Sequence, residues 1–335
     1  MNATPPHEAK NRYLKDKSTD VTDSTLSNYE TTLNVFCGWL TDEADVDTLN
    51  TLSSDDTQKF KEWRLERVKT ITLKSDMTCI KGFIRFCEHI NAVPEGMHKL
   101  VRVPKPSRED EVSSDLITSE EASEILDYLD THEYASLRHV IFRTLWKTGM
   151  RRSSLYALDV DDFDDGSKPV LRLRHRPDTG TPLKNKRRGE RDVRLDRETA
   201  DVIADFLKHN HPSGTDQHGR TPLLMSTQGK RCKPSTIQRN IYTVTRPCHY
   251  TGECPMGRDL DECEATSYNT ASKCPGSVGP HALRRGYVTE ALNAGQPRDV
   301  TADRVDMTTE VLNKHYDHAT KEERMERRED YLVDV

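Results

Sequence analysis

The chain has 335 residues, of which 33% are hydrophobic and 32% are charged, and its formal net charge is −6. This length suits two domains of ordinary size, and the composition is that of a folded protein rather than a disordered one. No apolar run approaches the roughly 18 residues of a membrane-spanning helix, and the opening MNATPPHEAK has no apolar signal core, so we expect a cytoplasmic protein.

The N-terminal third of the chain has the pattern of a helical domain. We predict a disordered tail over residues 1–18 and a small helical bundle without strands over residues 19–103. Within the bundle the apolar residues recur at steps of three and four, which places them along one face of a helix. Two such stripes occur, at Leu26, Tyr29, Leu33, Phe36 and Leu40 and at Leu73, Met77, Ile80, Ile84 and Cys87.

A linker and a second domain follow. Residues 104–115 carry two prolines among charged and small residues, which disfavours regular structure. The second domain, residues 116–335, opens on a capping box formed by Thr118 and Glu121. A helix then ends at Gly149, because glycine most easily adopts the left-handed conformation that closes a helix.

The rest of the second domain mixes one strand pair with helices. Residues 170–176 alternate apolar and basic side chains as a half-exposed strand does, and residues 191–195 are able to pair with them across a glycine-containing loop. Helical patterns return further along, at 197–209, 235–245, 281–294 and 308–331. We therefore predict a mainly α fold of the α+β class, with a small antiparallel sheet in the second domain.

Charge is unevenly distributed along the second domain. The segment 171–195, LRLRHRPDTGTPLKNKRRGERDVRL, is strongly basic, whereas DVDDFDD at 159–165 is acidic. The negative net charge alone argues against a nucleic-acid partner, but this separation suits a polyanion bound at one face. The alternative is a solvated basic hairpin without a partner.

Two further segments carry side chains suited to a phosphate. In GPHALRRGY, Pro280 is placed to begin a helix, so His281 and Arg284 share a face in its first turns, where the backbone N–H groups favour an anion. Arg151 follows the helix-ending Gly149 directly. Tyr316, in KHYDHAT near the end of the chain, is by itself either a packing residue or a nucleophile.

The order of these motifs is informative in combination. TGMRRS at 148–153, the lysine-rich hairpin, PHALRRG at 280–286 and KHYDHAT at 314–320 together resemble the tyrosine recombinase, or phage integrase, family. The likeness extends over most of the chain, since those enzymes carry an N-terminal helical core-binding (SAM-like) domain before the catalytic domain. In detail the chain is most similar to the integrase-like recombinases of halophilic archaea and their viruses.

The resemblance implies a role for each residue. Arg151 and Arg284 would each donate two N–H bonds to a scissile phosphodiester, and Tyr316 would attack its phosphorus to give a 3′-phosphotyrosyl link. His281 is suited to accept the phenolic proton, because a phenol is a weak nucleophile at neutral pH. The lysine that protonates the leaving 5′-oxygen is Lys184 or Lys186, and the spacing to the second strand favours Lys184. Further contacts to DNA phosphates are expected from Arg152, Lys186, Arg187, Arg188 and Arg191.

The chain also departs from the family pattern. The acidic residue often found three positions after the first arginine is Ser154 here. No histidine or tryptophan of the usual third motif precedes Tyr316 at the expected place, and Arg304 or His315 would have to substitute for it. These departures keep two alternatives open, a resolvase or type IB topoisomerase-like enzyme and a DNA-binding regulator that has lost catalysis.

Four cysteines cluster just before the second arginine motif. Cys248, Cys254, Cys263 and Cys274 would satisfy a tetrahedral structural zinc, although their spacing is wide and irregular; reduced cysteines that pin a long loop are the alternative. We expect no metal or nucleotide to be needed for catalysis. The expected function is site-specific DNA recombination on double-stranded DNA by a homotetramer, without membrane association.

Overall fold

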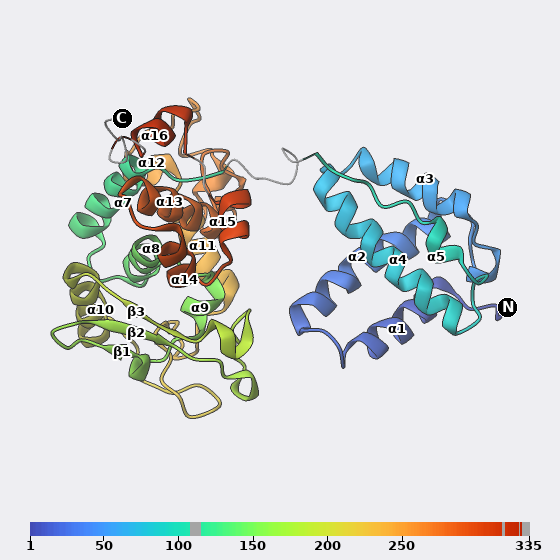
Figure 1. Cartoon of the computed structure of the whole chain (residues 1–335), viewed down its shortest axis with the longest axis horizontal. Helices are drawn as coiled ribbons and strands as arrows, with labels where there is room; N and C mark the ends of the chain where they lie inside the picture. Colours follow the sequence, from blue (N-terminus) through green and yellow to red (C-terminus); the bar gives the residue numbers. More distant parts are fainter. Residues whose placement is uncertain (108–114, 317–318, 328, 330–335) are drawn as a thin grey trace, which may run out of the picture. The chain divides into compact units, whose positions relative to one another are not determined.

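The computed structural model describes residues 1–107, 115–316, 319–327 and 329, and it divides the chain into two compact units, residues 1–113 and 114–335 (Figure 1). Both units are mainly helical, and the second contains one small antiparallel sheet, so the predicted fold class is confirmed. Part of the predicted linker, 108–114, lies outside the described residues. Within the described residues no helix is long and apolar enough to cross a membrane.

The first unit is a helical bundle. Its helices are α1 (Pro6–Lys17), α2 (Asp23–Asp42), α3 (Ser54–Leu65), α4 (Thr70–His89) and the short α5 (Met97–Leu100). Side chains cap two of them: the Thr22 hydroxyl accepts from the N–H of Thr25, and Ser53 forms a capping box with Asp56. The two predicted stripes supply much of the core, including Leu33, Phe36, Leu40, Leu73, Met77, Ile80 and Ile84.

The disordered tail predicted for residues 1–18 is wrong. This segment forms α1, which packs on α2 and α4. Ala9 and Tyr13 are buried, and the Tyr13 ring meets the Phe83 ring edge-on with 5.7 Å between centroids. Three buried residues, Pro6, Ala9 and Tyr13, among charged neighbours are too weak a pattern to identify a helix from the sequence, but in the fold they pack α1 against the bundle.

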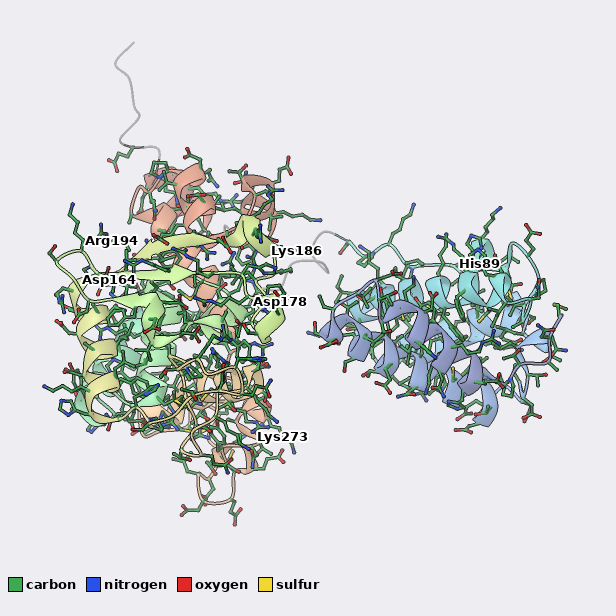
Figure 2. All side chains as sticks on the ribbon, turned by 90° about the horizontal axis from the view of Figure 1, so that it is seen from below. His89, Asp164, Asp178, Lys186, Arg194 and Lys273 are labelled. Atoms are coloured by element: carbon green, nitrogen blue, oxygen red, sulfur yellow. The ribbon has the colours of Figure 1, made fainter. Side chains whose placement is uncertain are left out.

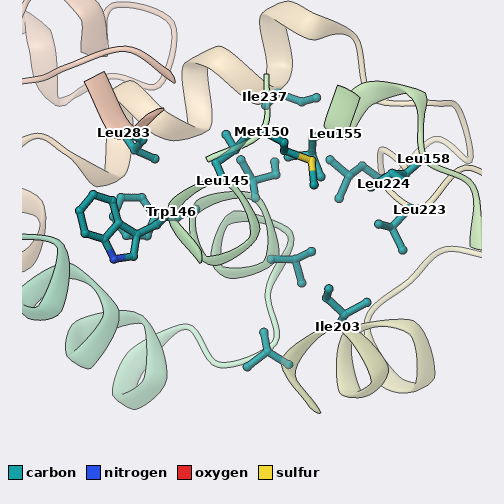
Figure 3. Packing of buried hydrophobic residues seen from close by; sticks show 14 of the residues in the cluster. Leu145, Trp146, Met150, Leu155, Leu158, Ile203, Leu223, Leu224, Ile237 and Leu283 are labelled. Atoms are coloured by element: carbon teal, nitrogen blue, oxygen red, sulfur yellow. The ribbon is translucent and has the colours of Figure 1, made fainter. Parts of the chain in front are cut away.

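The second unit is built around α8 (Leu137–Thr148). Most of its side chains are buried, and it packs against α10, α11 and α13. Its surroundings are α7 (Ser119–His132), α9 (Arg152–Ala157), α10 (Arg197–His209), α11 (Pro234–Val244), α12 (Pro247–Tyr250), α13 (Pro280–Asn293), α14 (Arg298–Val305), α15 (Thr309–His315) and α16 (Lys321–Glu326). Figure 3 shows apolar side chains from several of these elements meeting around α8, among them Leu145, Met150, Ile203, Ile237 and Leu283.

The sheet has three antiparallel strands in the order β1–β2–β3: β1 (Phe163–Asp164), β2 (Val170–Leu173) and β3 (Arg191–Arg194). Leu171 pairs with Val193, and both side chains are buried against the core; the next residue of β2, Arg172, pairs with Asp192 and is only half-buried. The predicted strand pair is therefore correct, although β2 ends at Leu173. The connection between β2 and β3 carries the lysine-rich segment.

The single helix predicted over 308–331 is wrong, because the structure divides it. Helix α15 ends at His315, and α16 begins after Thr320, whose hydroxyl forms a capping box with Glu323. Tyr316 thus lies at a helix end rather than in the middle of a helix. Within the predicted range, residues 317–318, 328 and 330–331 lie outside the described residues.

Candidate active site

Arg151 lies in the turn between α8 and α9. Gly149 closes α8 with φ +60°, and a Cβ there would lie 2.2 Å from a ring carbon of Tyr287, so this position requires glycine for both its conformation and its close contact. Arg151 is the N-cap residue of α9, directly before Arg152, and its side chain is 15% exposed. Its Nη1 donates to the Asp306 carboxylate, and its Nη2 donates to the Asp306 carbonyl oxygen at 2.6 Å.

Arg284 lies on the first half of α13, which begins at Pro280 as predicted. Only 1% of the residue is exposed, and its Nη1 donates to the Gly149 carbonyl at 2.6 Å. Its Nε and Nη2 are buried and have no hydrogen-bond partner among the described residues. Burial first, and then the nearby charge of Arg151, lowers the pKa of Arg284 to about 10. A buried arginine with two unsatisfied donor atoms is prepared to receive an anion.

His281 lies one turn before Arg284 at the accessible start of α13. Desolvation, followed by the positive charges of Arg285 and Arg284, lowers the pKa of His281 to about 4. The lowered pKa keeps the imidazole neutral at pH 7 with a lone pair free for a proton, but it also makes the ring a weaker base than an ordinary histidine. Lys184 is among the further charges that act on this ring, so the lysine-rich turn reaches the vicinity of His281.

Tyr316 is held beside Arg284 in the same chain. Its N–H donates to the Leu312 carbonyl at 3.0 Å, and its carbonyl accepts from the Thr289 hydroxyl of α13 at 3.1 Å. The Arg284 guanidinium carbon lies 5.4 Å from the centroid of the Tyr316 ring, within cation–π range. The phenol is thus next to the arginine that has unsatisfied donors.

A cavity of about 260 Å³ is lined by Arg151, His281 and Arg284, whereas Tyr316, whose ring lies beside Arg284, is not among its lining residues. Four arginines and one carboxylate, Asp115, are among its lining residues in the described chain, so its surroundings are strongly positive. The residues that line it are Asp115, Met150, Arg151, Arg152, Gln238, Tyr242, Gly279, Pro280, His281, Ala282, Arg284 and Arg285. Segments separated by well over a hundred residues in the sequence therefore form one site for a phosphate-sized anion.

The predicted DNA-contacting residues divide into three groups. Arg152 lines the phosphate-sized cavity and donates from Nη1 to the Gln238 side chain. Lys186, Arg187 and Arg188 are exposed and line a second, more open cavity of about 800 Å³ together with Asp178, which lies near Lys186 on the same side of the unit (Figure 2).

Arg191 differs from this group. Its side chain is 12% exposed, and it donates to the carbonyls of Gly189 and Arg304 at 3.0 and 2.8 Å. Arg191 therefore joins β3 to the end of α14, and its contact with DNA stays a prediction. Burial lowers the pKa of Arg191, which nevertheless remains charged.

Of the two substitutes considered for the missing third motif, Arg304 is not among the described residues that line the cavity. Arg304 donates to the Tyr287 hydroxyl at 2.6 Å and to the Arg194 carbonyl at 2.9 Å, so it is a structural tie between α13, α14 and β3. The side chain of His315 lies outside the described residues. The sequence did not point to Asp306, which binds Arg151. The feature that could have indicated it is an acidic residue that tolerates a left-handed backbone and directly follows a short helical segment.

The four cysteines of the insertion do not assemble a zinc site. Cys248, Cys254, Cys263 and Cys274 are half-buried and free, and among the described residues no group of three or more His, Cys, Asp or Glu is placed to hold a metal ion. The loop is instead fastened by polar contacts. His249 lies 3.1 Å from the Glu133 carboxylate, and Arg246 donates to the Ala265 carbonyl.

Comparison with known proteins agrees with this geometry. The sequence profile described as "Phage integrase family" matches residues 115–323, and "Phage integrase, N-terminal SAM-like domain" matches residues 12–90. The chain therefore belongs to the phage integrase family.

The chain is also similar to curated recombinases. The chain is 21% identical to tyrosine recombinase XerC of Pediococcus pentosaceus over 91% of this chain and 90% of the relative. It is also 21% identical to a probable integrase/recombinase of Methanocaldococcus jannaschii over 79% of this chain and 72% of the relative.

Solved structures show the same fold. The Tn1549 transposon integrase in complex with a circular intermediate DNA gives a TM-score of 0.67 at 15% identity, covering 98% of this chain and 100% of the other. A lambda integrase tetramer bound to a Holliday junction gives 0.64 at 13% identity, with 96% of this chain and 80% of the other covered.

Proposed function

We propose that this chain breaks and rejoins DNA strands by attack of Tyr316 on a phosphodiester held by Arg151 and Arg284. As a member of the phage integrase family it is a tyrosine-type site-specific DNA recombinase, and DNA is its partner. The observation that carries the residue roles is the position of the Tyr316 ring, 5.4 Å from an arginine with two unsatisfied buried donor atoms.

In the cleavage step the Tyr316 Oη forms a bond to phosphorus, and the bond from phosphorus to the 5′-oxygen breaks. The phenolic proton passes to the neutral His281, and the departing 5′-oxygen receives a proton from Lys184. The arginines stabilise the negative charge that builds on the non-bridging oxygens. Because the phosphotyrosyl bond retains the energy of the broken bond, a 5′-hydroxyl attacks it in the reverse sense and rejoins DNA without a nucleotide cofactor.

Lys184 is preferred over Lys186 as the general acid for an electrostatic reason. The charge of Lys184 acts on His281, whereas Lys186 lines the outer cavity with Arg187 and Arg188. Lys186 with φ +53° belongs to the turn that exposes these three side chains, and this group is suited to contact DNA phosphates. Recombination between paired sites would proceed in a homotetramer.

Covalent trapping tests the proposal. A pool of duplexes with random sequence and a nick near the cleavage position lets a short fragment diffuse away after cleavage, so an active protein stays bound through heating in detergent. We expect the native protein to form this adduct and Tyr316→Phe to form none while still binding DNA. Retention of both proteins only as salt-sensitive complexes would instead indicate a DNA-binding regulator.

A further inference from the structure

Asp306 contacts several residues around the site but has no role in the cleavage and rejoining steps proposed above. It follows α14, adopts a left-handed conformation with φ +59°, and has a side chain that is 12% exposed. Its Oδ2 accepts from Arg151 Nη1, and its Oδ1 accepts from Asn185 Nδ2 at 2.8 Å. One carboxylate therefore binds a guanidinium of the phosphate cavity and the turn that carries Lys184 and Lys186.

The surroundings of Asp306 are adapted to this arrangement. A Cβ at position 189 would lie 3.2 Å from Asp306 Oδ2, so Gly189 leaves room for the carboxylate. Arg191 Nη1 lies 3.9 Å from the same oxygen, and Arg191 Nε donates to the Arg304 carbonyl at 2.8 Å, which fastens β3 to the end of α14. The position of the carboxylate is thus fixed from two sides.

We propose that Asp306 is a positioning residue that aligns Arg151 and the lysine-bearing turn with each other around the scissile phosphate. This inference rests on the proposed function. Asp306 supplies the carboxylate that Ser154 does not provide to Arg151. The two hydrogen bonds from Arg151 to Asp306 use two of the five N–H groups of the guanidinium and leave the others for a phosphate.

The alternative interpretation of the contact between Arg151 and Asp306 is that it acts as a gate. The carboxylate would then occupy the place of the phosphate and would have to leave before DNA binds. Two observations favour positioning. The backbone carbonyl of Asp306 also accepts from Arg151 at 2.6 Å, so displacement would require α14 to move and not only a side chain. Asn185 would lose its partner in the same movement.

The test uses Asp306→Asn in the full-length chain. Asparagine tolerates the left-handed backbone and can accept from Asn185, but it lacks the charge that fixes Arg151. Asp306→Glu restores the charge on a longer side chain, and Asp303→Asn removes an equal charge from an exposed position of α14. DNA affinity, melting temperature and the rate of covalent adduct formation at saturating duplex are measured for each, on a duplex recovered from the trapped pool.

We expect Asp306→Asn to form the adduct roughly 10- to 100-fold more slowly, with DNA affinity and melting temperature unchanged, because a small misplacement of catalytic groups costs up to about 100-fold. The rate of adduct formation of Asp306→Glu should be intermediate, and that of Asp303→Asn should match the native chain.

A faster or unchanged rate in Asp306→Asn, or a slowing that Asp303→Asn shares, overturns the inference. If Asp306→Asn does not fold, a native rate in Asp306→Glu overturns it. Absence of any adduct with the native protein instead contradicts the proposed function.

Discussion

Arg284 carries its charge in the interior of the second unit, where it is stabilised by one carbonyl and by the face of the Tyr316 ring. Leaving buried donors unsatisfied costs on the order of 1–3 kcal/mol for each group. The protein keeps this arrangement where a phosphate would complete the hydrogen bonds. The unsatisfied donors destabilise the DNA-free protein, and an anion that accepts hydrogen bonds from them would remove that cost.

Replacement of Arg284 by lysine is the first prediction at this scale. A lysine retains the charge but cannot donate to Gly149 and to two phosphate oxygens from a planar group. We expect Arg284→Lys to slow adduct formation by roughly 100-fold or more, the loss typical of removing a donor that stabilises charge in the transition state. Arg197→Lys, at an exposed arginine of α10 outside the cavity, is the control and should change the rate little.

The titration of His281 is the second prediction. Its pKa is lowered to about 4 in the DNA-free protein, below the ordinary value near 6.5, so the ring should stay neutral from pH 7 down to about pH 5. Because the unfolded chain binds the proton more readily, His281 makes the free energy of unfolding fall as the pH drops from about 6.5 to about 4. Histidine NMR spectra, assigned with His281→Gln, measure the midpoint, and a value near 6.5 would contradict the predicted environment.

At the scale of elements, the site depends on where helices end. The turn after α8 carries Arg151, the start of α13 carries His281, and the end of α15 carries Tyr316. The sequence predicted the first two because a glycine and a proline mark them. It did not predict the break after Tyr316, although Thr320 and Glu323 form a capping box, because the charged helical composition continues on both sides.

Gly149 gives a prediction for the element that carries Arg151. A left-handed backbone costs a non-glycine residue roughly 1–2 kcal/mol, and overpacking costs about 1–3 kcal/mol more. Gly149→Ala should therefore destabilise the protein by roughly 2–5 kcal/mol, because its Cβ would collide with Tyr287. Gly180→Ala is a matched control: its φ is +74° and no atom lies within 4 Å of the added Cβ, so only the backbone cost applies. Urea denaturation measures both, and equal losses would contradict this account.

At the scale of the whole molecule, function depends on where charge lies and not on its sum. The net charge is −6, yet four arginines line the phosphate-sized cavity and a basic turn lines the open one. The sequence revealed the basic segment and the order of the motifs. It did not reveal that Arg191 turns inward or that Asp306 meets Arg151, since both depend on contacts between segments more than a hundred residues apart.

The exposed turn gives the prediction at this scale. Each cation that neutralises a DNA phosphate contributes about 0.9 to the slope of log affinity against log salt. Replacing Arg187 and Arg188 by glutamine should make the slope shallower by about two, while the native fold is kept because both side chains are exposed. Fluorescence anisotropy at several salt concentrations measures the slope, and an unchanged slope would show that the turn does not contact DNA.

The central claim is that one particular phenol becomes bonded to DNA. Three tyrosines lie at or near the site: Tyr242 lines the cavity, Tyr287 binds Arg304, and Tyr316 lies beside Arg284. Digestion of the trapped covalent complex and mass spectrometry of the peptide that carries the nucleotide identifies the attacking residue. The account predicts a 3′-phosphate ester on Tyr316, and an ester on Tyr242 or Tyr287 would contradict it.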